Sequence, residues 1–314
     1  TCKALVSYIE EKDIDKCIDI IKCPDLPLYG KIIYNKDTFR NIYKTGKGSF
    51  TQLGNYTYDK EQNKISITEV PYDTYIEDIE KKLREAYDKG LFREIEDIND
   101  ASGKQGIQLD IFVRKNTNID QFITKLRKYT PFESKFSCNF TILDLDNKTP
   151  VLMNLENIFN KWIIHRHNCI NKEIQFDIDK VNRELNKLYG LKIISTELDK
   201  AIDIIRKSKS ENEAILNLEI EFKLNKEQLE YISSIRLVNM NKEWINNKII
   251  QIDRLESEIH RLNGILNNSS EINKIIVEQL NEAISKYGKP RMTEIIYENE
   301  IQEISESQLI EDYS

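Results

Sequence analysis

Two long stretches of this chain repeat apolar residues at the spacing of a coiled coil. In residues 155–189 and 243–287, apolar side chains recur at alternating intervals of about three and four residues, which places a narrow apolar seam on each helix. The seam residues are Ile174, Ile178, Val181, Leu185 and Leu188 in the first stretch, and Ile245, Ile252, Leu255, Ile259, Leu262 and Leu266 in the second. Neither helix can bury its own seam, so we expect the two to pair in antiparallel. At a rise of about 1.5 Å per residue, they predict an arm of about 50 Å.

The segment between these stretches, residues 190–242, predicts several short amphipathic helices. One of them is expected to begin at Asn225, a residue type that caps helix N-termini. So small a bundle cannot hide all of its apolar residues, so we expect it to associate with a second copy of itself. The residues expected at that contact are Ile202, Ile205, Leu229, Ile232, Ile235 and Leu237.

Residues 23–154 alternate between β-branched runs and amphipathic helices. Residues 65–70 alternate apolar and polar side chains with the period of a half-buried strand, and Pro71 ends the run. The other expected elements are strands at 107–113 and 140–145 and helices at 75–91 and 119–129. We therefore predict an α+β fold, in which a mixed α/β domain with mixed or antiparallel strands precedes the coiled coil and its helical tip.

The two ends of the chain differ in character. The first residue is Thr1, and residues 1–22 are already amphipathic, so we interpret them as the end of a preceding domain with a connecting helix. The chain is therefore expected to be a fragment of a longer protein. Gly288 and Pro290 stop the last helix, and residues 288–314 are expected to form an acidic linker.

Basic residues gather near the start of the α/β domain, although the whole chain of 314 residues has a net charge of −7. The candidates for contact with a polyanion are Lys31, Arg40, Lys44 and Lys47. The turn Thr45-Gly46-Lys47-Gly48-Ser49 lacks the spacing of a nucleotide-binding loop, yet its backbone and its lysines could meet phosphate oxygens. An ordinary solvated surface with a plain turn is the alternative.

The sequence indicates no catalytic residue and no metal site. The five cysteines are odd in number and form no C-x-x-C pair, which favours reduced thiols. His165 and His167 have no third ligand nearby, and Asp97, Asp100 and Asp110 surround a turn where capping is the commoner task of such residues. No apolar run approaches the length of about 18 residues that spans a membrane, so no membrane partner is expected.

A series of short motifs runs through the chain in a fixed order. They are Pro24-Asp25-Leu26-Pro27, Tyr43-Lys44-Thr45-Gly46-Lys47-Gly48-Ser49, Thr68-Glu69-Val70-Pro71-Tyr72, Ile95-Glu96-Asp97-Ile98-Asn99-Asp100-Ala101-Ser102, His165-Arg166, Gly190-Leu191, Asp203-Ile204-Ile205-Arg206, Ile235-Arg236-Leu237 and Tyr287-Gly288-Lys289-Pro290-Arg291-Met292-Thr293-Glu294-Ile295. Taken together, they resemble the A subunit of bacterial type IIA DNA topoisomerases, the family of gyrase and topoisomerase IV.

This resemblance implies a role for each segment. Residues 23–154 would be the tower domain beside the DNA gate, residues 155–189 and 243–287 the coiled coil, and residues 190–242 the globule that dimerises to close the exit gate. Double-stranded DNA, a second copy and the topoisomerase B subunit would be the partners. The whole enzyme would be cytoplasmic and would change DNA topology by double-strand passage, using ATP and Mg²⁺ through its B subunit.

The resemblance also implies what the chain lacks. The family's nucleophilic tyrosine lies upstream in a winged-helix domain, within an arginine–tyrosine motif that is not found here, so the fragment alone is expected to be inactive. Lys47 stands where the family often has arginine, and a lysine offers a point charge in place of a bidentate fork. The alternative function is that of a non-catalytic coiled-coil protein with a hinge-like, dimerising tip. The motifs around Gly46 and Tyr72 separate the two, because a bare hinge protein has no need of them.

Overall fold

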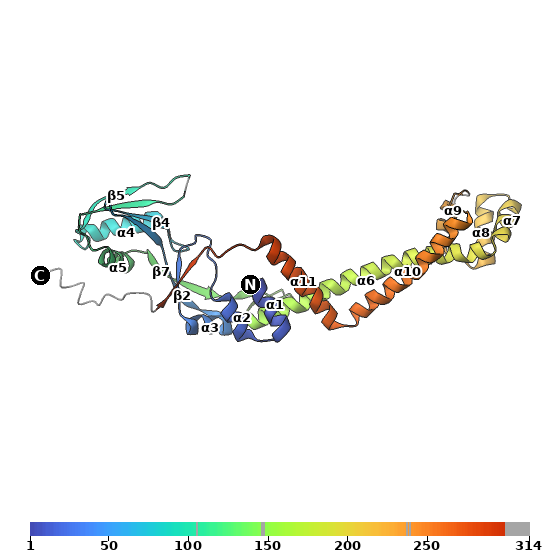
Figure 1. Ribbon diagram of the computed structural model, residues 1–314, viewed down its shortest axis with the longest axis horizontal. Coiled ribbons are helices and arrows are strands. Elements are labelled where there is room, and N and C mark those ends of the chain that lie inside the picture. Colours follow the sequence, from blue (N-terminus) through green and yellow to red (C-terminus); the bar gives the residue numbers. More distant parts are fainter. Residues whose placement is uncertain (105, 146–147, 237, 239, 299–314) are drawn as a thin grey trace. The chain divides into compact units, whose positions relative to one another are not determined.

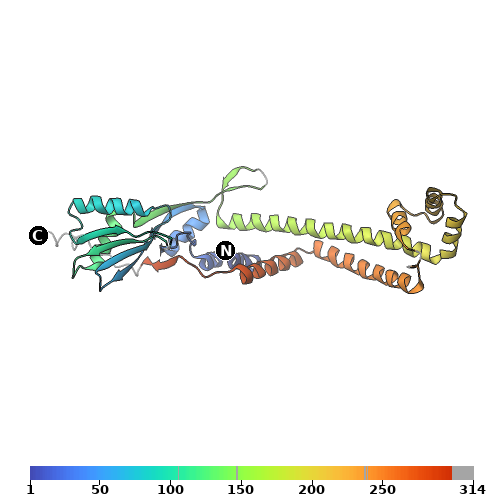
Figure 2. The same cartoon turned by 90° about the horizontal axis from the view of Figure 1, so that it is seen from above.

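The computed structural model of the chain describes residues 1–104, 106–145, 148–236, 238 and 240–298. These residues form two compact units (Figures 1 and 2). The first unit contains residues 1–161 and the described residues that follow 278, and the second contains residues 162–278. Each unit is described separately below.

A four-stranded sheet in the first unit has the order β10-β1-β2-β7. Its strands are β1 (Lys31–Tyr34), β2 (Lys47–Leu53), β7 (Glu133–Asn139) and β10 (Glu294–Tyr297). Strand β10 pairs in parallel with β1, whereas the other neighbours are antiparallel. Helix α3 (Lys36–Thr45) packs on this sheet through Phe39, whose ring centroid lies 5.2 Å from that of Phe50.

A second sheet carries the main apolar core of the first unit. Its order is β3-β4-β6-β5, and all of its neighbours are antiparallel. Its strands are β3 (Asn55–Asp59), β4 (Lys64–Glu69), β5 (Ile95–Asp100) and β6 (Leu109–Val113). The helices α4 (Ile76–Asp88) and α5 (Ile119–Tyr129) cover one face, where Ile79, Leu83 and Phe122 are buried against strand residues such as Ile65 and Ile111 (Figure 1). The predicted α+β class, with mixed and antiparallel strands, is confirmed.

Two short helices and a small hairpin complete the first unit. The predicted connecting helix is two helices, α1 (Cys2–Glu11) and α2 (Ile14–Ile21). Between them Lys12 ends α1 in a left-handed conformation, and the Asp13 side chain caps α2. The hairpin pairs β8 (Thr141–Leu143) with β9 (Pro150–Leu152). The Tyr8 hydroxyl of α1 donates to Asn160 Oδ1 at 3.0 Å, which ties α1 to the start of helix α6 (Leu155–Thr196).

The second unit contains the predicted antiparallel helix pair, formed by α6 and α10 (Lys242–Leu266). Leu185 and Leu188 pack with Ile252, and each predicted seam residue is buried or half-buried. Two contacts show that the pairing is antiparallel. Tyr189 forms a hydrogen bond with Glu256, whereas His167, which comes earlier on α6, contacts Asn273, which comes later in the chain. Figures 1 and 2 agree in placing α6 and α10 side by side.

The tip of the second unit is a bundle of the helices α7 (Leu198–Lys207), α8 (Glu211–Phe222) and α9 (Lys226–Ser234) around the end of α6. Its core contains Ile194, Ala201, Leu218, Leu224, Leu229 and Ile232. Asn225 caps α9 as predicted, in a capping box with Gln228. Gly190 lets α6 approach α9 closely, because a Cβ at this position would lie 2.7 Å from Gln228 Cβ.

The helix boundaries in the second unit differ from those predicted. Helix α6 continues to Thr196, beyond the expected end at residue 189. The second arm is not one helix, because α10 ends at Leu266 and α11 (Ser269–Tyr287) begins after a break. At that break the Asn268 side chain accepts a hydrogen bond from Ser270 N, which is a local alternative to the helical bond.

In the first unit, the structure differs from one predicted strand and from the predicted linker. The strand expected at 140–145 is the short β8, and most of the pairing here is made by β7, which ends at Asn139. The expected acidic linker is not wholly a linker, because β10 lies within it and pairs with β1. Residues 299–314 of that expected linker lie outside the described residues.

Candidate functional site

The basic residues predicted to contact DNA lie on two strands of the first sheet and on helix α3. Arg40 and Lys44 lie one turn apart on α3, Lys31 opens β1, and Lys47 opens β2. Helix α3 forms here because the Asn35 side chain accepts from the N–H groups of residues 37 and 38, and the helix stops at Gly46. The structure therefore brings only Arg40 and Lys44 together by local geometry.

An acidic residue of α2 partly neutralises this pair. Asp15 Oδ1 lies 3.1 Å from Arg40 Nε and 2.9 Å from Lys44 Nζ. The hydrogen bond from Lys44, followed by that from Arg40, holds the pKa of Asp15 below its usual range despite an opposing effect of desolvation. Asp15 therefore links α2 to α3 through ion pairs. Its negative charge also makes Arg40 and Lys44 attract a polyanion less strongly than two unpaired cations would.

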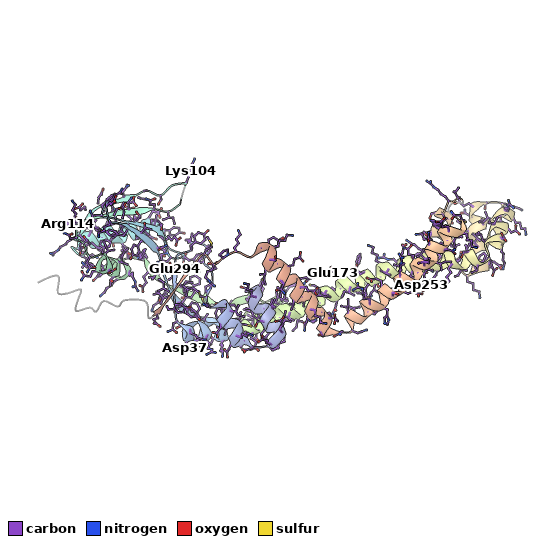
Figure 3. All side chains as sticks on the ribbon, viewed as in Figure 1. Asp37, Lys104, Arg114, Glu173, Asp253 and Glu294 are labelled. Carbon is purple, nitrogen blue, oxygen red and sulfur yellow. The ribbon has the colours of Figure 1, made fainter. Side chains whose placement is uncertain are left out.

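Lys31 and Lys47 stand at opposite ends of the sheet. Lys31 is paired in register with Leu53, at the far end of β2 from Lys47. Lys47 and Leu53 are six residue steps apart, which is about 20 Å along the strand. Lys31 Nζ also forms an ion pair with Glu294 Oε2 of β10 at 3.2 Å (Glu294 is labelled in Figure 3). Of the predicted residues, Lys47 is the exposed cation for which the described residues provide no ion-pair partner.

The glycine turn after α3 is a helix C-cap joined to a strand, and not an open phosphate loop. Gly46 adopts φ +75°, and its N–H donates to Ile42 O, while Lys47 N donates to Thr45 Oγ1. A Cβ at Gly46 would lie 2.4 Å from Met153 O, and one at Gly48 would lie 2.5 Å from Ile42 Cγ1. The turn needs glycine because the backbone passes close to its neighbours, and the N–H groups of Gly46 and Lys47 are already used.

The acidic residues around the β5–β6 hairpin have structural partners. Asp100 Oδ1 accepts from Ser102 N at 2.9 Å, which is the capping task expected for this turn. Asp110 is buried and accepts from Ser66 Oγ at 2.6 Å and from Gln108 Nε2. Within the described ranges no three metal-ligating side chains converge. At the tip of this hairpin Lys104 is exposed and points away from the sheet (Figure 3).

The sequence motifs at the two ends of the chain form one clasp, which the sequence reasoning did not foresee. Asp25 accepts from the backbone N–H groups of Met292 and Thr293, and Leu26 N donates to Thr293 Oγ1 at 2.7 Å. The Arg291 guanidinium donates to the carbonyls of residues 21, 23 and 24 at 2.8–3.1 Å. Desolvation raises the pKa of Asp25, but the hydrogen bonds from Thr293 and Met292 outweigh it, so the pKa is lowered overall.

A pocket of about 470 Å³ lies beside this clasp. Its lining residues are Pro24, Leu26, Pro27, Phe39, Ile42, Tyr43, Tyr72, Phe136, Ser137, Cys138, Asn139 and Phe140. Three of the motifs noted in the sequence therefore meet at one place, through Pro24, Tyr43 and Tyr72. Burial raises the pKa of the Tyr43 hydroxyl well above its usual range, so this tyrosine has no sign of activation as a nucleophile.

At the tip of the second unit, the predicted contact residues divide into two groups. Leu229 and Ile232 are buried in the bundle's own core, although Ile232 also lines the pocket that the second group forms. Ile202, Ile205 and Ile235 line an open pocket of about 560 Å³ between α7, α8 and the end of α9, and Ile205 is 50% exposed. Leu237 lies outside the described residues. The same pocket is also lined by the polar residues Ser208, Lys209, Ser210, Glu211 and Ser233, and an apolar patch with a polar rim is typical of an interaction site.

In the part of the chain that the structure describes, no helix is long and apolar enough to cross a membrane.

A family model that describes the A subunit of DNA gyrase/topoisomerase IV matches residues 1–281.

Curated relatives from both branches of this family match the chain over most of its length. The DNA gyrase A subunit of Borreliella burgdorferi is 31% identical over 315 residues, which cover 99% of this chain and 38% of that protein. The DNA topoisomerase 4 A subunit of Haemophilus influenzae is 30% identical, covering 94% of this chain and 39% of the relative. The DNA gyrase A subunit of Kosmotoga olearia is 27% identical, with 93% and 36% covered. The chain thus spans less than two-fifths of the length of each of these relatives.

Proposed function

Because the chain belongs to the family of DNA gyrase and topoisomerase IV A subunits, we propose that it serves a type II DNA topoisomerase. It would supply the tower, the coiled coil and the exit gate to ATP-dependent double-strand passage, without the catalytic tyrosine. The observation that carries this proposal is the antiparallel pair of α6 and α10 with a helical bundle at its tip, in a chain whose residues 1–281 match the family.

In this proposal the first unit contacts double-stranded DNA through its basic residues. Lys47 is exposed, and Arg40 and Lys44 can turn from Asp15 toward phosphates at little cost, because ion pairs between exposed side chains are weak in water. Lys31 would contribute less, since it is drawn toward Glu294. The contact would be electrostatic and independent of base sequence, so affinity should fall steeply as salt rises.

The tip of the second unit would close the exit gate by pairing with a second copy. The open pocket lined by Ile202, Ile205 and Ile235 supports this, since a second copy would cover apolar side chains that the bundle leaves exposed. Leu229 would act indirectly, by holding the bundle together, whereas Ile232 is part of the core and also lines the pocket. Leu237, which lies outside the described residues, stays a predicted contact.

The other partners come to this chain through its family. We propose that the partner which brings ATP and Mg²⁺ to the whole enzyme is a topoisomerase B subunit, and that the enzyme works in the cytoplasm. This chain would hold neither cofactor itself. The whole protein would change DNA topology, whereas this chain alone would leave DNA uncut.

Two experiments test the proposal. When the chain is mixed with supercoiled plasmid, ATP, Mg²⁺ and a B subunit, we expect a salt-sensitive complex with neither relaxation nor protein-linked breaks. A cleaved or relaxed plasmid would overturn the non-catalytic role. In the second experiment, Ile205→Asp should weaken self-association by at least about tenfold, because a charge enters an apolar contact.

The matched control for that variant is Ile220→Asp. Ile220 is an isoleucine of the same bundle, 74% exposed, that does not line the pocket. Sedimentation velocity should report weaker association for Ile205→Asp alone. Equal association of the two variants would place the contact elsewhere and refute the proposed face.

A further inference from the structure

Strand β7 is an edge of its sheet, with β2 as its one neighbour among the described strands. The hydrogen bonds to β2 determine which backbone groups of β7 point to the open side. Phe140 N donates to Gly46 O, and Gly54 N donates to Phe132 O, each at 2.9 Å. In an antiparallel ladder, residues bonded to the partner alternate with residues whose N–H and C=O point away. The even-numbered residues of β7 therefore bond to β2.

The odd-numbered residues Lys135, Ser137 and Asn139 point their backbone groups to the open side. All three are exposed, and their backbone groups make no further hydrogen bond within the described residues. Donors and acceptors repeat along this edge about every 6.8 Å, the spacing of alternate residues in an antiparallel strand. A polypeptide backbone in the extended conformation matches that repeat.

The pocket of about 470 Å³ runs beside the same edge. Phe136 and Cys138 share one face of β7, and the pocket is lined by β7 residues 136–139 and by Phe140, which follows the strand. The rings of Tyr72 and Tyr43 flank them, with centroids 5.6 Å from Phe136 and 6.0 Å from Phe140. No lysine, arginine, aspartate or glutamate is among its lining residues. A pocket of this size and lining suits a neutral aromatic or large aliphatic group.

We propose that this edge binds an extended segment of a partner protein as a fifth, antiparallel strand. Its backbone would bond to Lys135, Ser137 and Asn139, and an aromatic side chain would enter the pocket, as in recognition by β-strand addition. Lys135 is exposed and has no ion-pair partner among the described residues, so an acidic residue in the segment would complement it. Of the residues proposed to contact DNA, Lys47 lies opposite Asn139 on β2, which is the side of β7 away from the open edge.

The test uses the full chain and a fluorescent, end-blocked probe peptide, Asp-Thr-Phe-Thr-Val-Thr-Asp. In antiparallel pairing, the residues opposite Phe136 and Cys138 share the pocket face, and their own N–H groups point away from β7. The threonines then carry the bonds to the edge. N-methylation of the three threonines should weaken binding by at least tenfold, about the loss expected for several hydrogen bonds. N-methylation of Phe and Val should change it by less than about twofold.

Equal affinity of the two methylated peptides, or no saturable binding of the unmethylated probe by about 1 mM, would overturn the proposal. A lysine at an open edge serves in other sheets to prevent pairing, and the second result would assign that role here.

A matched pair of protein variants gives a second readout. Ser137→Pro removes an outward N–H without touching the bonds to β2, whereas Ser137→Ala keeps it. We expect the proline variant, but not the alanine variant, to bind the probe at least about tenfold more weakly. Circular dichroism checks that the two protein variants fold. If either variant does not fold, the comparison of methylated peptides on the wild-type chain still tests the proposal. If Ser137→Pro lowers the molar mass without peptide, a second copy occupies the edge and the proposal is wrong.

Discussion

Thr293 holds together two segments that are 267 residues apart in the sequence. Its hydroxyl accepts from Leu26 N at 2.7 Å, and both residues are buried, Thr293 to 1% and Leu26 to 8% exposure. In Thr293→Val the shape of the side chain is kept but the acceptor is lost. A buried N–H without a partner costs about 1–3 kcal/mol, so the opening equilibrium at this clasp should rise about 5- to 140-fold.

Hydrogen exchange followed by mass spectrometry measures this change at the clasp. Peptides that contain the Leu26 amide should exchange faster in Thr293→Val, by the factor given above, when opening and closing are fast. Thr293→Ser is the matched control, because it keeps the acceptor and should retain protection. If the valine and serine variants exchange at the same rate, the hydroxyl does not stabilise the clasp, and the reasoning fails.

Three further predictions concern the first unit. Desolvation raises the pKa of Asp110, but hydrogen bonds from Ser66 and Gln108 and the charge of Lys64 lower it overall. The carboxylate therefore adds stability above its unfolded pKa of about 4, and this is lost as the pH falls below that value. Urea unfolding should then vary less with acid pH in Asp110→Asn, and an unchanged pH profile would contradict the assignment. Gly46→Ala should destabilise the protein by about 1–3 kcal/mol in thermal unfolding, because φ is +75° and Met153 O is 2.4 Å from the added Cβ. The control Gly264→Ala, with open space around it in a helix, should be neutral or stabilising. Lys47→Gln should weaken duplex binding and lower the slope of log affinity against log salt by about one. Lys60→Gln, another exposed lysine, should leave both unchanged, and equal effects of the two would refute a specific role for Lys47.

The periodic parts of the fold could be predicted from the sequence. The seam residues of α6 and α10 are buried or half-buried because a helix places residues three and four apart on one face. The same periodicity concealed the break after Leu266, since Ile272 and Ile276 continue the apolar pattern and are also buried. Whether the backbone is continuous there depends on the local bonds of Asn268, which the pattern does not contain.

The remaining features depend on partners far away in the sequence. Strand β10 is only four residues long, and it is a strand because β1 lies beside it. Strand β7 was missed because its polar and small residues weaken the alternation, while its pairing with β2 fixes it. The sequence shows where the basic residues are, but it does not show which of them form ion pairs. The fold brings Asp15 close to Lys44 and Glu294 close to Lys31, and these contacts decide it.

In the proposed function, residues 190–242 join two copies of this chain at the tip of the helix pair. The molar mass of the wild-type chain in solution tests it most directly, measured by light scattering over a range of micromolar concentrations. We expect a mass of twice 37.0 kDa. A mass of 37.0 kDa at all concentrations would contradict it.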